Sequence, residues 1–484
     1  MESNDKINVG LDFGTHQTKI CIQRIPDEGH GEPSYEFFSF KGLDGERSYF
    51  LPSLIQINED DTLSYGFVDK TIEKSAGEEP TLELLEVPKV DIEKKARELF
   101  DKYANLGQDK KDKQSLITML KLKLKQDQQK VEKENESRRS AYDLALKKYK
   151  SGLNTFRYFK QATFSLRDWT AKIDSQRLCI WYLAYVIFLI EDKIGNLFSI
   201  NMGIPTDDNS FEKKKQLAVS VLASAYNLVE NIYHNDINAF LKAPINELME
   251  KTEMIQFSPE LIVDYAINVF PEAYAGLLSL TARGKITDGM SLTVDIGGGT
   301  TDISFFTIDD RKPCIYKYWS VPLGLNFLAE ESGFDYFDRD FEESISEKAL
   351  SKYNQEKTGV ISELVRLLYT KHSEIGISKE YLSNALKNRA IVYMGGGSSF
   401  TSIITELGPF SEIHMLDSSI WKEEQVADKS SVGRLSKLLS ISYGLASANN
   451  DDKVKLYSIK NIFGMAEKGK RETPQDRYVD KDMC

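Results

Sequence analysis

The sequence predicts an α/β protein with two lobes, and three features of the chain support this prediction. The chain has 484 residues, which is too long for a single hydrophobic core, because domains average about 150 residues. Strand-like segments alternate with helical ones along most of the chain. Two distant segments, VGLDFGT (9–15) and TVDIGGGT (293–300), share one pattern of apolar strand, aspartate, glycine and threonine. This internal repeat indicates two similar lobes that face each other.

The first lobe is expected to begin with a β-hairpin over residues 7–25, with its turn at FGTHQ. Further strands are predicted at SYFLPSLIQI (48–57), TLSYG (62–66) and LFSINMGIP (197–205). Helices are predicted at LCIWYLAYVIFLI (178–190), at 211–228 and at 261–280. The apolar run at 178–190 is shorter than the roughly 20 residues that span a bilayer, so we expect a buried helix there.

The second lobe is expected to begin with the hairpin LTVDIGGGTTDISFF (292–306), and a mixed helical stretch should follow at 325–386. Residues 389–408 should form a strand, a glycine turn and a short helix that ends at Gly408. A helix is predicted at 432–448, and Gly444 in its middle predicts close packing, because glycine costs a helix about 1 kcal/mol against alanine. The predicted organisation is therefore a first lobe at 1–288, a second at 289–448 and a polar tail at 449–484.

An insertion at about residues 70–157 differs in composition from the rest of the first lobe. Residues 108–150 contain no glycine or proline and carry 13 Lys/Arg against 7 Asp/Glu, whereas the remaining chain has a net charge of −18. One or two long polar helices are predicted, without a clean coiled-coil heptad. They form either a solvated helical arm or a docking surface for an acidic protein partner.

The bulk composition narrows the classes of function. The net charge of −12 argues against general nucleic-acid binding, because phosphate backbones require a basic surface. The four cysteines and five histidines show no metal-ligand spacing. The N-terminus has no basic start followed by an apolar run. These observations predict a cytoplasmic protein outside the membrane and leave its oligomeric state open.

The glycine-rich turns suggest phosphate binding. Glycine lets a ligand approach the backbone, so the N–H groups of Gly297, Gly298 and Gly299 can surround an anion, and Thr15 and Thr300 add hydroxyl donors. Aspartates beside a phosphate make sense when Mg²⁺ lies between them, held through its water shell. The motif GxxxxGK[ST] is absent and the glycines join strand to strand, which disfavours a P-loop and a dinucleotide fingerprint.

Three segments, VGLDFGTHQTK (9–19), TVDIGGGTTDISFF (293–306) and IVYMGGGSSF (391–400), resemble the phosphate 1, phosphate 2 and adenosine segments of the actin, Hsp70 and sugar kinase superfamily. The Hsp70 branch is the most similar, on the segments LPSLIQI, FSINMGIP, FPEAYAGL and ISYGLASA. The resemblance implies an α/β, two-lobed actin/Hsp70-like ATPase fold of duplicated ribonuclease-H-like domains, with ATP and Mg²⁺ in the cleft and the helical insertion in the first lobe.

The resemblance also implies roles for individual residues. Asp12 and Asp295 would organise Mg²⁺ through water, and Glu272 would orient the hydrolytic water. The nucleotide would be held by phosphate-side residues Gly14, Thr15, His16, Gly297, Gly298, Gly299 and Thr300, by the turn residue Gly324, and by the adenosine-side residues Gly395, Gly396, Gly397 and Ser398.

Some residues depart from the Hsp70 pattern. His16 stands where Hsp70 usually has a second threonine, and Gly324 is the one glycine kept from the "LGG" turn. Lys19 matches the phosphate lysine of actins and some sugar kinases, whereas Lys160 in FRYFKQATF resembles the lysine that Hsp70 uses. Either lysine could neutralise phosphate charge, and each could equally be a solvated surface lysine. The interval 325–389 is shorter than in Hsp70, so the adenine-clamping residues are not carried over.

The expected function is that of an ATP-binding, Mg²⁺-dependent ATPase that acts as a nucleotide-driven switch or chaperone-like regulator of a protein partner. About 36 residues follow the last predicted helix, which leaves no room for an Hsp70 substrate-binding domain, so a partner is expected at 108–150. An actin-like filament protein, a small-molecule kinase and a nucleotide-locked pseudoenzyme are the alternatives.

Overall fold

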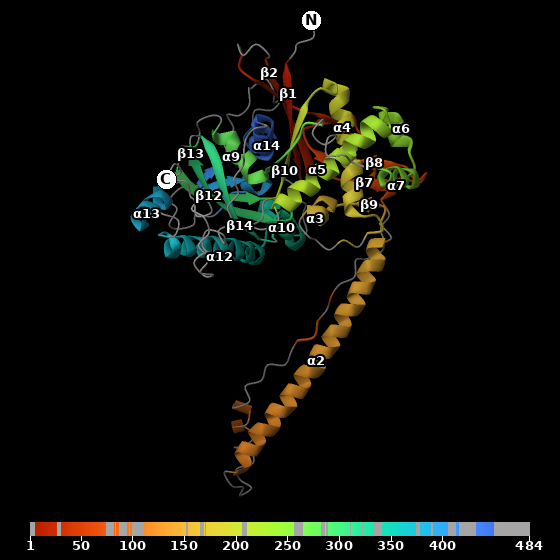
Figure 1. Cartoon of the computed structure of the whole chain (residues 1–484). Coiled ribbons are helices and arrows are strands. Elements are labelled where there is room, and N and C mark those ends of the chain that lie inside the picture. Colours follow the sequence, from red (N-terminus) through yellow and green to blue (C-terminus); the bar gives the residue numbers. More distant parts are fainter. Residues whose placement is uncertain are drawn as a thin grey trace, which may run out of the picture. The chain divides into compact units, whose positions relative to one another are not determined.

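The computed structural model is a mixed α/β structure with several sheets (Figure 1). It describes residues 5–26, 31–73, 82, 84–86, 94–95, 97–98, 111–151, 153–164, 169, 171–205, 211–255, 265–281, 286, 289–309, 311–321, 323–332, 341–373, 378–388, 391–404, 413–415 and 432–449. The chain divides into two compact units. The insertion unit consists of Lys70–Thr155 with Thr170–Lys172, and the main unit comprises the rest.

The first large sheet of the main unit has the strand order β11-β10-β1-β2-β3, and β6 also pairs with β2. Strands β1 (Lys6–Phe13), β2 (Gln17–Ile25) and β3 (Ser34–Phe37) are antiparallel neighbours. Strands β10 (Ser199–Ile204) and β11 (Ile267–Pro271) extend the sheet in parallel on the other side of β1. The predicted hairpin at 7–25 and the strand at 197–205 are confirmed.

The second large sheet has the order β14-β13-β12-β15-β16. Strands β12 (Gly289–Ile296), β13 (Thr301–Asp309) and β14 (Lys312–Val321) are antiparallel, whereas β15 (Ile391–Met394) and β16 (Ile413–Met415) continue in parallel from β12. The two large sheets therefore have the same arrangement, three antiparallel strands followed by two parallel ones. The glycine segments connect equivalent strands, β1 to β2 and β12 to β13.

Two helices pack against both sheets. Helix α14 (Val432–Ser447) contacts β1, β2 and β10 of the first sheet, and α9 (Glu272–Thr281) contacts β10 and β11 of the first sheet and β14 of the second. The two helices also contact each other extensively. Their shared core includes Leu277 and Leu445 together with Phe306 and Met394 of the second sheet. The ends of the hairpins are thereby fixed relative to each other within the main unit.

Further elements complete the main unit. Helix α4 (Ser175–Ile194) is buried along most of its length, as predicted for 178–190, and it packs against α5 (Phe211–Asn227). One small sheet comprises β4 (Phe40–Lys41) and β5 (Arg47–Ser48). Another comprises β8 (Leu63–Tyr65), β7 (Ile55–Ile57) and β9 (Thr155–Phe156), and the chain passes from the insertion unit to the main unit within β9. The remaining short elements are β6 (Leu51–Pro52), α3 (Phe159–Phe164), the π-helix η3 (Leu228–Ile232), α6 (Ile237–Lys242) and α7 (Ile245–Glu253).

Between β14 and β15 the described residues form four helices: α10 (Leu325–Ser332), α11 (Phe341–Ser344), α12 (Glu347–Lys371) and α13 (Lys379–Asn388). Strand β12 turns Leu292 and Val294 toward a core that also contains residues of α10, α11 and α12. In β13, Ile303 and Phe305 join this core, whereas Phe306 and Ile308 join the core with α9. The second sheet is thus covered on both faces.

In the insertion unit, residues 111–151 form one long helix, α2 (Lys111–Ser151) (Figure 1). This matches the prediction of a long polar helix. Its Asn135 is buried and exchanges two hydrogen bonds with the backbone of Leu85, at 2.8 and 2.9 Å. Met119, Leu122 and Leu144 are exposed apolar residues on the same helix.

Some sequence expectations were wrong. Residues 267–271 form strand β11, so the helix predicted at 261–280 begins only at Glu272, after Pro271. A proline is tolerated at the start of a helix but not in its interior, which explains the boundary. After β15 the chain forms a 3₁₀ turn, η4 (Gly396–Ser399), and no helix follows in the described residues up to 404. Strand β14 was not predicted.

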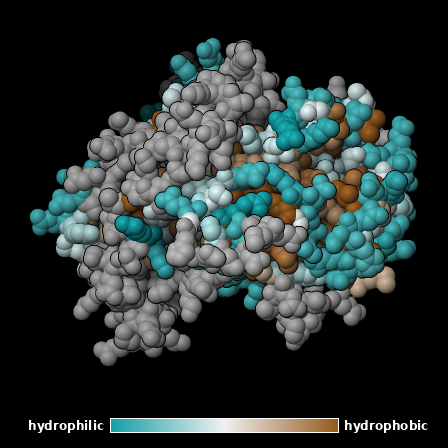
Figure 2. Space-filling model, turned by 90° about the horizontal axis from the view of Figure 1, so that it is seen from above, coloured by the Kyte–Doolittle hydropathy of each residue, from teal (hydrophilic) through white to brown (hydrophobic). Residues whose placement is uncertain are grey.

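The helix predicted at 432–448 is confirmed by α14. Gly408, residues 108–110 and the tail from residue 450 lie outside the described residues, and the division of the lobes at 288/289 stays a prediction. None of the described helices is long and apolar enough to cross a membrane. Hydrophilic side chains cover much of the described surface in the view of Figure 2, with smaller apolar areas between them.

Candidate functional site

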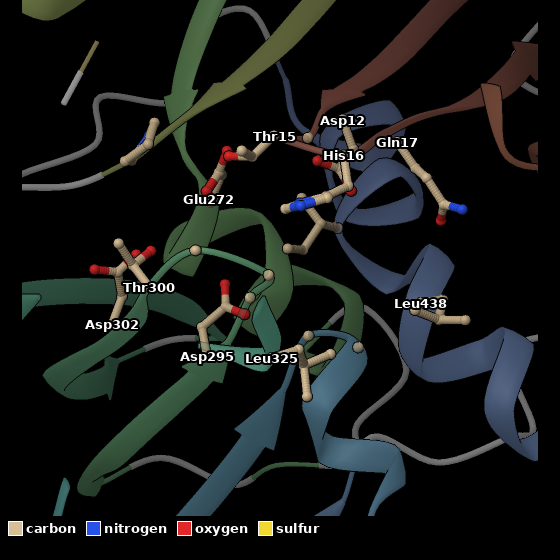
Figure 3. Close-up of a pocket in the computed structure, with 18 of the residues that line it drawn as sticks. Asp12, Thr15, His16, Gln17, Glu272, Asp295, Thr300, Asp302, Leu325 and Leu438 are labelled. Atoms are coloured by element: carbon tan, nitrogen blue, oxygen red, sulfur yellow. The ribbon is translucent and has the colours of Figure 1, made fainter. Parts of the chain in front are cut away.

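A cleft in the main unit lies where the two glycine hairpins meet (Figure 3). The empty space in it is about 1100 Å³, a volume that includes the part open to solvent. Its lining comprises hairpin residues Asp12, Gly14, Thr15, His16, Gln17, Lys19, Asp295, Gly297, Gly298, Gly299, Thr300 and Asp302, together with Lys160, Gln161, Pro205, Glu272, Leu325, Gly395, Gly396, Phe400, Lys437, Leu438 and Ile441. The residues predicted from both hairpins are therefore brought together.

The first hairpin presents an ion pair to the cleft. Asp12 and Lys19 are directly opposite each other on β1 and β2, and the Lys19 ammonium donates to the Asp12 carboxylate at 2.9 Å. In the turn, the Gly14 amide donates to the carbonyl of Gln17 at 3.1 Å. A Cβ on Gly14 would lie 2.3 Å from that carbonyl oxygen, so only glycine fits this turn.

The second hairpin presents two acids at the equivalent place. Asp295 and Asp302 are directly opposite each other on β12 and β13. Burial is the largest cause that raises the pKa of Asp295, to about 8, and the nearby carboxylates of Glu272, Asp302 and Asp12 raise it further. The Lys19 ammonium lowers the pKa of Asp295, but this effect is smaller than the combined increase from burial and from the three carboxylates. This end of the cleft therefore has an unbalanced negative charge.

The glycine loop between β12 and β13 is held by its carbonyl groups. The carbonyls of Gly297 and Gly298 accept from the amides of Leu325 and Asn326, at 3.0 and 2.8 Å, at the start of α10. The cleft side of the loop contacts other side chains: a Cβ on Gly298 would lie 2.4 Å from Nδ1 of His16, and one on Gly299 would lie 3.0 Å from the Gln161 amide.

Gly324 lies behind the loop and is not among the residues that line the cleft. A Cβ there would lie 2.5 Å from the carbonyl oxygen of Gly298, so Gly324 supports the loop by its small size. The resemblance to Hsp70 predicts a nucleotide contact at Gly324, and this residue does not line the cleft.

A second ion pair lies between the hairpins. Lys160 of α3 is almost fully buried, and its ammonium donates to Glu272 Oε1 at 2.6 Å. Glu272 is the first residue of α9, and its side chain packs against Gly203, where a Cβ would lie 3.1 Å from Glu272 Cγ. Figure 3 shows Glu272 pointing into the cleft near Thr15.

The opposite part of the cleft is mainly apolar. Leu325, Phe400, Leu438 and Ile441 line it, with Leu438 and Ile441 contributed by α14. Figure 3 shows Leu325 and Leu438 on the side of the cleft away from Thr300 and Asp302. The cleft is therefore polar toward the hairpins, and toward α14 it is apolar except for Lys437.

The third glycine segment borders this apolar part. Gly395 has a φ of +77°, and a Cβ there would lie 2.3 Å from Asp295 Oδ1. Both the backbone conformation and the lack of space therefore require glycine. Gly395 and Gly396 line the cleft. Gly397 and Ser398 lie behind them, where the Ser398 hydroxyl donates to the Gly395 carbonyl at 2.8 Å.

Sequence reasoning missed nine residues that line the cleft: Gln17, Gln161, Pro205, Asp302, Leu325, Phe400, Lys437, Leu438 and Ile441. Asp302 could have been found, because it follows Asp295 at the same spacing at which Lys19 follows Asp12. Lys437 donates to the Ser398 carbonyl at 3.2 Å, and burial lowers its pKa. Nothing in the sequence near Lys437 and Leu438 distinguishes them from other residues of an amphipathic helix.

The acid cluster is suited to a hydrated divalent cation. Among the described residues no group of three or more His, Cys, Asp or Glu side chains has the arrangement of a directly coordinated metal site. Mg²⁺ commonly keeps several waters and takes only one or two protein carboxylates beside substrate phosphates. The half-buried Asp295, with its raised pKa and neighbouring acids, is a place where such a cation would relieve repulsion.

Searches of protein-family models and of curated proteins find no match to this chain.

Proposed function

We propose that this protein binds MgATP in the cleft and hydrolyses it, as an Hsp70-like member of the actin, Hsp70 and sugar kinase superfamily that works as a nucleotide-driven switch. One observation carries the proposal. Two equivalent hairpins, each with an aspartate at the end of its first strand and glycine in its turn, converge on one cleft.

The arrangement of the sheets supports the superfamily assignment. Both large sheets have three antiparallel strands followed by two parallel ones, and the connecting glycine turns occupy equivalent positions. Duplicated sheets of this kind are what the resemblance in sequence implies for a two-lobed, ribonuclease-H-like ATPase. The helices α9 and α14 between them would transmit a change at the cleft, because each contacts elements of both halves.

The polarity of the cleft suggests how ATP lies in it. Backbone amides and hydroxyls of the hairpin turns would bind the phosphates, since turns rich in glycine make anion-binding concavities. The apolar part, with Phe400, Leu325 and Leu438, would take the base, and Gly395 and Gly396 would border the sugar. Aromatic and aliphatic side chains with a few polar groups are typical of small-molecule sites.

Hydrolysis would depend on positioning more than on covalent chemistry, as in other phosphoryl transfers. Glu272 would orient a water for attack on the γ-phosphate, and Lys160 holds that carboxylate in place at 2.6 Å. Lys19 and Lys160 both line the cleft and would offset phosphate charge. When bound, Mg²⁺ would supply charge neutralisation between the phosphates and Asp295.

Calorimetry with MgATP, MgADP and AMP tests the proposal. We expect MgATP and MgADP to bind in a one-to-one complex and AMP to bind much more weakly, since the hairpins contact the β- and γ-phosphates. Phosphate release should require Mg²⁺ and should fall by a factor of about 100 or more in Glu272→Ala, while MgATP binding persists. Absence of nucleotide binding in the unmodified protein would overturn the proposed function.

The insertion unit is the proposed site for a protein partner. Helix α2 exposes Met119, Leu122 and Leu144 on a segment with excess basic charge, which suits an acidic surface with apolar groups. Deletion of 108–150 should abolish capture of the partner and leave MgATP affinity unchanged. An unchanged set of captured proteins would exclude this role.

A further inference from the structure

Lys357 is a buried cation outside the cleft. It occupies a core position of α12, in a buried row with Tyr353, Ile361 and Leu364, and its side chain has no exposed surface. Its ammonium lies 5.3 Å from the centre of the Tyr353 ring and 5.7 Å from that of Tyr393. Burial lowers the pKa of Lys357 to about 8, so it still carries a proton at neutral pH. Buried lysines are costly, and each therefore calls for a physical reason.

The Lys357 ammonium donates a hydrogen bond to the carbonyl of Ile403. This contact continues a series of hydrogen bonds along the loop: the Ile403 amide donates to the Phe400 carbonyl at 3.2 Å, and the Phe400 amide donates to the Gly397 carbonyl at 3.2 Å. Lys357 thus anchors the far end of the loop whose other end is the glycine segment of the cleft.

Helix α11 holds the same loop from a second direction. One carboxylate oxygen of Glu342 accepts from the Ser402 amide at 2.7 Å and from the Thr401 hydroxyl at 2.9 Å. The neighbouring Phe341 packs edge-on against the Phe400 ring, with 5.2 Å between the ring centres. Phe400 itself lines the apolar part of the cleft.

Helix α12 also reaches the second hairpin. The Tyr353 hydroxyl, one turn before Lys357, lies 2.7 Å from the hydroxyl of Thr301, directly after the glycine loop. One helix therefore contacts the Thr301 hydroxyl behind the proposed phosphate side and the Ile403 carbonyl behind the proposed base side of the cleft.

We propose that Lys357 is a positioning residue for the base side of the site: by holding the Ile403 carbonyl, it fixes the 400–403 loop so that Phe400 presents its ring to the nucleotide base. This rests on the proposed function. It assigns Lys357 to nucleoside recognition and leaves the phosphates to the hairpins.

Two probes separate the two ends of the site. MgATP contacts both ends, whereas magnesium tripolyphosphate contacts only the hairpins. In Lys357→Met, which keeps the length of the side chain and removes the donor, we expect MgATP affinity to fall by about tenfold, with tripolyphosphate affinity within twofold of the unmodified protein. Lys352→Met is the matched control on an exposed part of α12 and should change neither affinity.

A double-mutant cycle with Phe400→Leu tests the coupling. If Lys357 acts through Phe400, the double variant should bind MgATP no more weakly than Phe400→Leu alone, because the ring is already absent. Additive losses would overturn the proposal, as would equal losses for both probes or no loss in Lys357→Met. Glu342→Ala provides a second variant that disturbs the same loop from a partly exposed residue and should give the same selective loss.

These outcomes are distinct from failure of the proposed function. If the unmodified protein bound neither MgATP nor tripolyphosphate, the proposed function and this inference would fall together. If it bound both ligands and the variants lost affinity for MgATP and for tripolyphosphate to the same extent, only the inference would be wrong.

Discussion

Lys160, which is almost fully buried, and Glu272, which is partly buried, form an ion pair with 2.6 Å between Nζ and Oε1, although 112 residues separate them in the sequence. The pair joins the short helix α3 to the first residue of α9. It holds a carboxylate at the wall of a cleft that already contains Asp12, Asp295 and Asp302. Removal of the lysine would leave this carboxylate in a strongly negative environment.

Lys160→Met is expected to lower the free energy of unfolding of the nucleotide-free protein by about 3 kcal/mol at pH 7, because breaking a buried pair leaves an uncompensated charge. Glu272→Gln should cost less, since the amide oxygen can still accept from Lys160. Urea denaturation of both variants measures the difference. A larger loss in Glu272→Gln than in Lys160→Met would contradict this account of the pair.

Asp295→Asn is expected to stabilise the nucleotide-free protein and to abolish its stabilisation by MgATP. The pKa of Asp295 is raised to about 8 in the folded state by burial and by neighbouring carboxylates, whereas the unfolded chain has an ordinary aspartate. The folded state therefore retains a proton that the unfolded state loses, and stability falls as the pH rises from about 4 to about 8. Asparagine does not titrate, so the variant lacks this loss of stability with rising pH.

Thermal unfolding at pH 8, with and without MgATP, measures both effects of Asp295→Asn. Glu363→Gln, at an exposed position of α12, provides the same change from carboxylate to amide without burial and should leave the melting temperature unchanged. A lower melting temperature for nucleotide-free Asp295→Asn would show that the carboxylate is not under repulsion.

Local sequence patterns predicted the two hairpins well. Each hairpin has apolar strands on both sides of a glycine turn, and Asp12 and Asp295 are the second-to-last residues of the first strand of each, so residue spacing alone located them. The same reasoning placed α4 and α14, which have long apolar faces. Gly444 was expected in a close contact, and it lies against the backbone of α9.

The rest of the site depends on contacts between distant segments. Phe400 and Leu438 reach the cleft only because β15 and α14 pack beside the hairpins, and no local pattern records this. Lys357 appears in the sequence as an ordinary helix lysine, and only its register with Tyr353 and Ile361 shows that it must be buried. The boundary at Pro271 was missed because the apolar residues before it also suit a helix.

Glu191→Gln is expected to change the pH dependence of stability. Both carboxylate oxygens of Glu191 are buried without a hydrogen-bond partner among the described residues. Burial, and to a smaller extent the charge of Glu230, raise the pKa of Glu191 to about 7. An acid with a raised pKa in the folded state makes stability fall as the pH rises from about 4.5 to about 7.

The measurement is the melting temperature of Glu191→Gln minus that of the unmodified protein, from pH 5 to pH 8. This difference should increase with pH and level off above pH 7, and subtraction removes the contribution of Asp295. The adjacent exposed residue gives the control Asp192→Asn, for which the difference should stay constant. A difference that decreases with pH would contradict the assignment.

Gly444→Ala and Gly359→Ala are expected to change stability in opposite directions. Both glycines lie inside helices, where alanine alone would stabilise by about 0.5–1 kcal/mol. At Gly359 a Cβ would meet nothing within 4 Å, so this gain should appear in full. At Gly444 the Cβ would lie 1.8 Å from the carbonyl oxygen of Ala275, which forces α14 and α9 apart.

We therefore expect Gly444→Ala to lose about 3 kcal/mol in urea denaturation, the cost of overpacking a close contact. Because α14 also carries Leu438 and Ile441 into the cleft, the same substitution should weaken MgATP binding, whereas Gly359→Ala should not. A stabilised Gly444→Ala would mean that the two helices have room to separate without cost. In that case the contact between α9 and α14 could not transmit changes at the cleft, and the proposed switch would lose its connecting element.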